Sequence, residues 1–211
     1  MTPPLQALVA GATGLVGQAL VKQLSNDSRY RRVHCLVRRE GALNELAAGN
    51  TNVIQHCTDF KHLDRLPVWD KPVHVYICLG TTLKTAGSAS AFRAIDHDLV
   101  IAVAREAVTQ QAISVVWISS VGANAGSRNL YLRTKGEVED QLARLSGQTP
   151  IRHVNPSLLL GAREDSRPAE AIGQLVAPLI APLCVGPLAK WRPVRGEDVA
   201  GQMIALQEFR A

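Results

Sequence analysis

The chain has 211 residues, of which 46% are hydrophobic and 19% are charged. This length and balance predict one globular domain spanning residues 1–211 and exclude an intrinsically disordered chain. The formal net charge is +5, but Lys and Arg are scattered and form only two small clusters, at 29–32 and 38–39. A scattered charge of this kind predicts no nucleic-acid partner, since phosphate-bearing small molecules account for it equally well.

The four cysteines show no spacing typical of metal ligands; they are Cys35, Cys57, Cys78 and Cys184. We therefore expect reduced thiols and no metal site. The N-terminus lacks a basic stretch followed by a long apolar stretch and a cleavage site, so no signal peptide is predicted. Reduced thiols and the lack of an export signal predict a cytoplasmic protein.

Residues 171–189 carry no charge over a length close to that of a membrane span. Pro178, Pro182 and Pro187 lie within this segment. Each proline removes a backbone donor and disrupts the preceding helical turn, so a lipid-facing helix would leave polar groups unsatisfied. We expect no membrane span, and instead a proline-broken apolar lid or the subunit contact of a possible homodimer.

Apolar runs rich in β-branched residues alternate with amphipathic stretches along the chain. The runs predict strands at 5–10, 33–37, 53–56, 73–79, 113–119 and 151–155, and the stretches between them predict helices at 15–25, 40–48, 90–110 and 130–145. Near-continuous apolar strands are typical of a parallel sheet that is buried on both faces. The sequence therefore predicts a doubly wound, Rossmann-like α/β fold, with residues 156–211 forming a small C-terminal substrate cap over the carboxyl edge of the sheet.

The stretch "LVAGATGLVGQAL" (8–20) places three glycines three residues apart directly behind the first predicted strand. A strand that enters a helix through a tight turn needs a residue tolerant of positive φ, a point of close approach to a ligand and a point of close helix packing. The helix start would also present free N–H groups to an anion. The alternative is an ordinary glycine-rich loop. The residues predicted to bind a dinucleotide pyrophosphate are Gly11, Thr13, Gly14, Leu15, Val16 and Gly17.

The second predicted strand is followed by Arg38 and Arg39. An acid at this place accepts hydrogen bonds from a free ribose 2′-hydroxyl, whereas arginine accommodates a 2′-phosphate. The alternative is that both are solvated arginines at a strand end. Beside the glycine loop, these residues favour NADP(H) over NAD(H) as cofactor.

The next two predicted strands end in further candidate cofactor residues. Asp59 and Phe60 follow the third strand, where a carboxylate is placed to accept a hydrogen bond from the adenine amino group; a loop aspartate that begins the next element is an equal alternative. Leu79, Gly80 and Thr81 follow the fourth, and Gly80 would let the backbone pass close to the cofactor. The alternative for the threonines there is that they begin a turn.

The fifth predicted strand ends in Ser119 and Ser120, and Tyr131 and Lys135 follow on a predicted helix. A spacing of four residues stacks the last two side chains on one helix face. A neighbouring ammonium favours the phenolate, which suits a tyrosine to proton transfer, and the same lysine can hold ribose hydroxyls. We assign Ser120, Tyr131 and Lys135 as catalytic residues, with the serine polarising a substrate carbonyl. The alternative is that Tyr131 is a packed helix residue.

These motifs resemble those of atypical short-chain dehydrogenases/reductases, and more closely those of the Tat-interactive-protein branch. The similar stretches are "GATGLVG", "CLGTT", "KTAGSASAFRAIDHDLV", "ISSVGANAGSRNLYLRTKGEVE" and "NPSLLLGAREDSRP". The resemblance covers most of the chain to about residue 170. It implies an NADPH-binding Rossmann domain in which Ser120, Tyr131 and Lys135 form the catalytic set.

Two positions depart from the pattern of the wider superfamily. Where many members carry a proton-relay asparagine, this chain has Asp96, so the relay is not implied. Where an arginine usually precedes the proline after the sixth strand, this chain has Asn155; Pro156 is still expected to contribute backbone near the nicotinamide.

The leading hypothesis is an NADP(H)-dependent oxidoreductase that reduces a carbonyl of an unidentified small-molecule substrate. The alternative is an NADP(H)-sensing binding protein without turnover, in which cofactor occupancy biases contacts with a protein partner. Sugar-nucleotide epimerase chemistry ranks lowest, since only about fifty residues follow the sixth strand to form a substrate domain.

Overall fold

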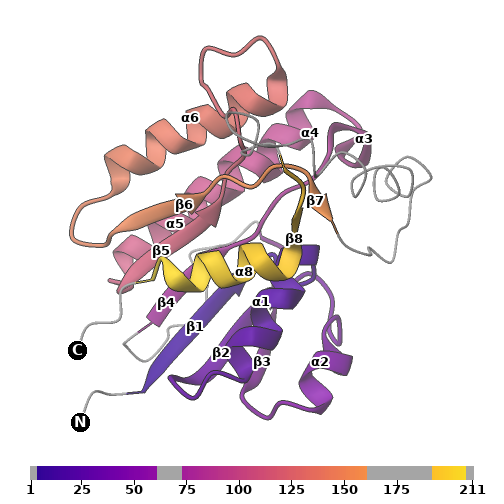
Figure 1. Ribbon diagram of the computed structural model, residues 1–211, viewed down its shortest axis with the longest axis vertical. Coiled ribbons are helices and arrows are strands. Elements are labelled where there is room, and N and C mark those ends of the chain that lie inside the picture. The colour runs from indigo at the N-terminus through magenta and orange to yellow at the C-terminus, as the bar shows by residue number, and fades with distance from the viewer. Residues whose placement is uncertain (1–3, 61–72, 161–191, 208–211) are drawn as a thin grey trace.

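The computed structural model describes residues 4–60, 73–160 and 192–207. Its centre is a six-stranded, all-parallel sheet of strand order β3-β2-β1-β4-β5-β6 (Figure 1). In chain order the strands are β1 (Leu5–Ala10), β2 (Tyr30–Val37), β3 (Val53–Cys57), β4 (Val73–Ile77), β5 (Ser114–Ile118) and β6 (Ile151–Val154). The order reverses between β1 and β4, which is the point where open α/β sheets bind their ligands at the carboxyl edge.

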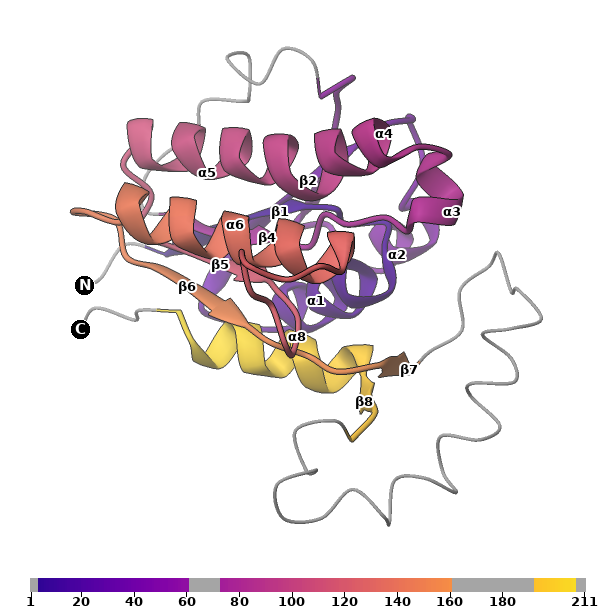
Figure 2. The same cartoon turned by 90° about the horizontal axis from the view of Figure 1, so that it is seen from above.

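Helices cover both faces of the sheet (Figure 2). Helices α5 and α6 lie on one face, and α1 and α8 lie side by side on the other. The helices are α1 (Leu15–Ser25), α2 (Asn44–Ala48), α3 (Leu83–Ala86), α4 (Ala89–Arg93), the π-helix η2 (Ala94–Leu99), α5 (Val100–Thr109), α6 (Leu130–Leu145) and α8 (Gly196–Ala205). The short strands β7 (Leu159–Leu160) and β8 (Val194–Arg195) pair with each other in parallel. The predicted doubly wound fold is confirmed.

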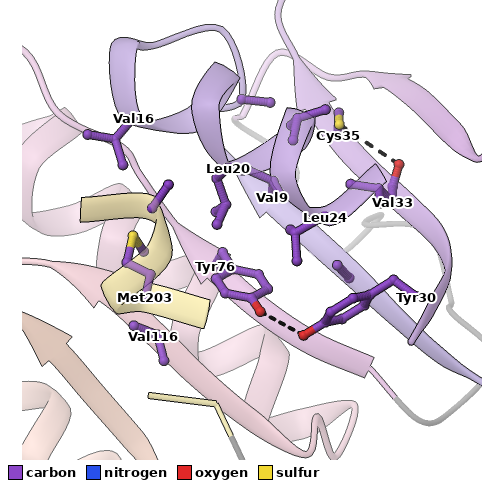
Figure 3. Close-up of a cluster of buried hydrophobic side chains, with 14 of the residues drawn as sticks. Val9, Val16, Leu20, Leu24, Tyr30, Val33, Cys35, Tyr76, Val116 and Met203 are labelled. Carbon is purple, nitrogen blue, oxygen red and sulfur yellow. Dashed lines mark hydrogen bonds between the residues drawn. The ribbon is translucent and has the colours of Figure 1, made fainter. Parts of the chain in front are cut away.

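Each face of the sheet buries its own apolar core, because the strands have almost no polar face. On the side of α1 and α8, Val9, Leu20, Leu24 and Met203 are fully buried (Figure 3). On the other side, Leu8 and Trp117 pack beneath helix residues such as Val103 and Val138. Burying one such side chain stabilises the fold by about 1.5–3 kcal/mol, so both helical layers are held firmly to the sheet.

The predicted elements differ from the observed ones mainly at their ends. Strand β2 begins at Tyr30 instead of residue 33, since Tyr30 and Arg32 already pair with β1. The helix predicted over 90–110 is divided into α4, η2 and α5, and α3 precedes it as a separate turn. The first turn predicted for 40–48 is a loop, in which Gly41 takes a φ of +72°.

The segment after residue 156 contains one element of the main α/β unit. Val199, Ala200 and Met203 of α8 are fully buried in the core that α1 and β1 also line. Helix α8 therefore belongs to the sheet layer, whereas the rest of the predicted cap is represented only by the β7–β8 pair. The apolar segment 171–189 lies outside the described residues.

Candidate cofactor and catalytic site

The glycine loop joins β1 to α1 at the carboxyl edge of the sheet. Gly11 has a φ of +84°, and a Cβ placed there would lie 2.6 Å from the Cys78 carbonyl carbon. At Gly17, a Cβ would lie 2.1 Å from the Gly11 carbonyl oxygen, so only glycine lets α1 approach the loop this closely. The turn and the close packing that the sequence predicts for this motif are both present.

In the part of the chain that the structure describes, no side chain caps the first N–H groups of helix α1. Gly14 is the N-cap residue, it makes no side-chain capping bond, and the first turn contains no acidic residue. The first-turn N–H groups of a helix have no intrahelical acceptor, and the helix dipole adds positive potential there. The start of α1 therefore fits a pyrophosphate. Thr13, Leu15 and Val16 lie next to Gly14 in the sequence.

Arg38 and Arg39 lie next to this loop. Ala10 at the end of β1 pairs with Leu36 of β2, so both chains leave the sheet side by side. The two arginines follow Val37 directly and are exposed. Among the described residues, neither arginine makes a hydrogen bond or an ion pair that would occupy its guanidinium. Both are thus free to meet an anion beside the glycine loop.

The loops after β3 and β4 lie at the same edge. Asp59 is exposed, and Phe60 takes a φ of +58° and packs partly against the core. Gly80 is exposed, Leu79 is half-buried, and the Thr81 backbone N–H donates to Asp96 Oδ2 at 2.7 Å. The neighbouring Thr82 caps α3, since its hydroxyl accepts from the Thr85 N–H.

Ser120 and Tyr131 lie at opposite ends of the loop that connects β5 to α6. The Ser119 hydroxyl is buried and donates to Glu139, whereas Ser120 is half-exposed and its hydroxyl makes only a long contact, 3.3 Å, to the Val121 carbonyl. Tyr131 is 36% exposed, and its ring contacts that of Phe92. Within the described part of the chain, the Tyr131 hydroxyl has no hydrogen-bond partner. Both hydroxyls are therefore available to a ligand.

Lys135 is buried beneath Tyr131, on the same face of α6. Only 3% of the residue is exposed. Its Nζ lies 3.3 Å from the Ile118 carbonyl oxygen, to which it donates, and 6.0 Å from the centre of the Tyr131 ring. Ile118 is the last residue of β5, and Ser120 follows it two positions later in the chain. The structure thus places Lys135 beneath Tyr131 and against the carboxyl end of β5.

The ammonium of Lys135 is paired with the carboxylate of Asp96. The sequence analysis noted this residue only because it stands where many superfamily members carry an asparagine. Asp96, in the π-helix η2, is 1% exposed, and its Oδ1 lies 3.1 Å from Lys135 Nζ. Burial raises the pKa of Asp96, while Lys135 and the Thr81 N–H act in the opposite direction. Through Asp96 of η2, this pair joins the loop after β4 to α6.

A second carboxylate was missed by the sequence analysis. Glu139 Oε1 accepts hydrogen bonds from Ser119 Oγ at 2.5 Å and from Asn155 Nδ2 at 2.9 Å. Its position was open to prediction, since Glu139 continues the spacing of four residues set by Tyr131 and Lys135. Pro156 is buried directly after Asn155, at the end of β6.

Helix α6 also depends on a glycine that the sequence analysis did not single out. A Cβ at Gly136 would lie 2.2 Å from the backbone nitrogen of Ala125, in the loop that precedes the helix. The absence of a side chain at Gly136 lets this loop pack directly on the helix turn that carries Lys135. The described residues contain no cluster of potential metal ligands, and no helix in them is long and apolar enough to cross a membrane.

Comparison with known proteins defines the group. Residues 7–194 match the model of the NAD dependent epimerase/dehydratase family. The chain belongs to this family. It is 31% identical over 206 residues to the protein FMP52, mitochondrial, of Eremothecium gossypii, covering 96% of this chain and 88% of that one. It is 34% identical over 163 residues to the protein HTATIP2 of Rattus norvegicus, covering 77% of this chain and 66% of that one. The resemblance to atypical short-chain dehydrogenases/reductases is confirmed.

Solved structures show the same fold. An oxidoreductase of the short chain dehydrogenase/reductase family from Burkholderia thailandensis superposes with a TM-score of 0.69 at 24% identity, over 98% of this chain and 86% of that one. A UDP-N-acetylglucosamine 4-epimerase from Methanobrevibacter ruminantium superposes with a TM-score of 0.70 at 15% identity, over 94% and 71%. The family implies a nicotinamide dinucleotide, NAD or NADP, as cofactor.

Proposed function

We propose that this protein is an NADP(H)-dependent oxidoreductase that reduces a carbonyl group of a small-molecule substrate through Ser120, Tyr131 and Lys135. The observation that supports this proposal most directly is the exposure of Tyr131 and the lack of a hydrogen-bond partner for its hydroxyl among the described residues. The residue is 36% exposed, and its ring lies over the buried Lys135 ammonium, 6.0 Å from Nζ. A tyrosine that served only packing would bury its ring and satisfy its hydroxyl.

Each of the three side chains has a role that follows from its position. The bound cofactor supplies hydride to the carbonyl carbon. Ser120 donates a hydrogen bond to the carbonyl oxygen and so orients it, and Tyr131 donates a proton to the same oxygen as negative charge develops there. The ammonium of Lys135 beneath the ring stabilises the negative charge that the Tyr131 oxygen carries once the proton has moved, and we assign its remaining N–H to a ribose hydroxyl of the cofactor.

The preference for NADP(H) is the part of the proposal that rests on Arg38 and Arg39. Charge-assisted contacts to a 2′-phosphate are each worth about 1.5–3 kcal/mol, or roughly ten- to a hundredfold in affinity. Arg38→Ala or Arg39→Ala is expected to weaken NADPH by this factor and leave NADH unchanged in calorimetric titrations. The control is Arg31→Ala, an exposed arginine nearer the amino end of the same strand. Equal affinity of the unaltered protein for NADH and NADPH would contradict the preference.

The alternative is an NADP(H)-sensing protein that turns nothing over. NADPH oxidation by the purified protein, followed against a panel of aldehydes, ketones and quinones, separates the two functions. The proposed enzyme oxidises NADPH in the presence of at least one compound of the panel and not in its absence. A protein that binds NADPH but never oxidises it, while its affinity for a protein partner changes with the cofactor, is the sensor. We further propose a cytoplasmic location and no nucleic-acid partner.

A further inference from the structure

Three elements that carry the proposed site meet at one carboxylate, that of Glu139 on α6. Its Oε1 accepts from Ser119 Oγ, directly after β5, at 2.5 Å, and from Asn155 Nδ2, directly after β6, at 2.9 Å. A single oxygen of the helix that bears Tyr131 thus binds the ends of both neighbouring strands. His153 Nε2 also lies 3.6 Å from this oxygen, at the exposed side of the cluster.

The two strand ends are also tied to each other beyond the regular ladder. The Ser119 N–H donates to the Val154 carbonyl at 2.9 Å, and the Val121 N–H donates to the Pro156 carbonyl at 3.1 Å. The Asn155 amide donates a second bond, to the Ser120 carbonyl at 3.2 Å. Two backbone bonds between the strand ends therefore flank Ser120, and its own carbonyl is held by the Asn155 amide that Glu139 also binds.

Glu139 acts on the same helix face as the proposed catalytic pair. Tyr131, Lys135 and Glu139 are spaced four residues apart, so they line one face of α6. Lys135 contacts the Ile118 carbonyl and Glu139 contacts the Ser119 hydroxyl. Two anchors in successive helical turns thus fix the distance between α6 and the end of β5.

We propose that Glu139 is a positioning residue, whose carboxylate locks α6 to the ends of β5 and β6 and so sets Ser120 against Tyr131. This role rests on the proposed function, because it is defined by the catalytic pair that it aligns. Glu139 does not touch the reacting atoms: it acts through Ser119 and Asn155. Its work is done by acceptance of hydrogen bonds and not by charge, so an amide at this position can replace the carboxylate.

The first test follows amide hydrogen exchange and requires no substrate. In Glu139→Ala, the Ser119 and Val121 amides are expected to exchange at least about tenfold faster than in the unaltered protein, while amides of β1 and β4 are unchanged. Glu139→Gln keeps an acceptor oxygen and should stay within threefold of the unaltered protein. Asp140→Ala, which removes an exposed carboxylate of the same helix, is the control and should change nothing. Exchange in Glu139→Ala equal to that in Asp140→Ala would overturn the proposal.

The second test separates positioning from stability. With a substrate from the panel, Glu139→Ala is expected to lower kcat roughly ten- to a hundredfold, with the KM for NADPH within twofold, and Glu139→Gln to restore most of kcat. Equal loss in the Gln and Ala variants would contradict the role as acceptor. Should Glu139→Ala fail to fold, Asn155→Ala deletes the amide that joins Glu139 to the Ser120 carbonyl, and must show the same faster exchange and lower kcat. If the unaltered protein oxidises NADPH with no compound, the proposed function fails, and with it the alignment of Ser120 and Tyr131 for catalysis. The exchange test then still decides whether Glu139 anchors α6 to the ends of β5 and β6.

Discussion

The two ends of the sheet both bury polar side chains, but they do so with different chemistry. Toward the amino end, the Tyr30 hydroxyl contacts His74 Nδ1 at 2.7 Å and the Tyr76 hydroxyl at 2.8 Å, and Figure 3 shows the two phenols facing each other. Nearby, the Ser114 hydroxyl donates to Gln207, whose amide donates to the Val75 carbonyl at 3.2 Å. We call these five side chains the amino-end network; none of them is an acid.

At the carboxyl end, the buried groups are a carboxylate and an ammonium. Asp96 and Lys135 are both nearly inaccessible to solvent, and Asp96 Oδ1 has the ion pair but no hydrogen bond of good geometry. Burying two charges costs free energy that their attraction only partly offsets. A neutral network with its hydrogen bonds made serves stability, whereas a buried charged pair costs stability and lies where we propose that the cofactor and substrate bind. We therefore expect the amino-end network to hold the fold and the charged pair to serve the proposed site.

The largest expected effect comes from breaking the charged pair on one side only. Asp96→Asn leaves the Lys135 ammonium buried without its counter-charge and should lower the free energy of unfolding by about 3–5 kcal/mol in urea titrations. Asp96→Asn combined with Lys135→Met removes both charges and should restore most of the stability, but not turnover. The control is Asp98→Asn, an exposed neighbour paired with His97. A double variant with a free energy of unfolding as low as that of Asp96→Asn alone would show that the unpaired charge of Lys135 is not the cause of the instability.

A smaller effect is expected in the amino-end network. Tyr30→Phe removes the hydroxyl that His74 and Tyr76 both contact, and should lower the free energy of unfolding by about 1–3 kcal/mol. The site lies at the opposite edge of the sheet, so NADPH affinity should stay within twofold. Fluorescence titration of the cofactor and urea unfolding of the same preparation measure both quantities. Loss of cofactor affinity without loss of stability would reverse the roles that we assign to the two ends.

The smallest effect concerns two neutral thiols of the core. Burial raises the pKa of Cys35 and of Cys78 to about 12, from an ordinary value of 9.0. Because the folded-state pKa is raised, the stability that each thiol contributes is complete below pH 9 and is lost as the pH rises toward 12. The expected slope is about 1.4 kcal/mol per pH unit for each thiol. Cys35→Ala should reduce the slope of unfolding free energy between pH 9 and 10, while Cys57→Ala, at an exposed thiol, should leave it unchanged. Equal slopes of unfolding free energy against pH in the unaltered protein, Cys35→Ala and Cys57→Ala would contradict burial of a neutral Cys35.

The fold was predictable from the sequence because its signals are local. A largely apolar run of four to seven residues predicts each strand, and Gly11 and Gly17 stand where the backbone needs a positive φ and a close approach. The contacts of the site were less predictable. Asp96 meets Lys135 across 39 positions of the sequence, and no periodicity records which buried carboxylate faces which ammonium. The π-helix at 94–99, where Asp96 lies, likewise has no signature in hydrophobic spacing. By contrast, Glu139 could have been predicted from the sequence, since it repeats the helical spacing of Tyr131 and Lys135.

In the proposed function, Tyr131 performs proton transfer at a cofactor site that does not need its hydroxyl. The most direct measurement compares NADPH oxidation with NADPH binding in the unaltered protein and in Tyr131→Phe, using the substrate found in the panel. We predict that Tyr131→Phe lowers turnover by ~10²- to 10⁴-fold and leaves NADPH affinity nearly unchanged. Lys135→Ala, in contrast, should weaken both. Reduction of the same substrate by Tyr131→Phe at an unchanged rate would show that Tyr131 is not the proton donor.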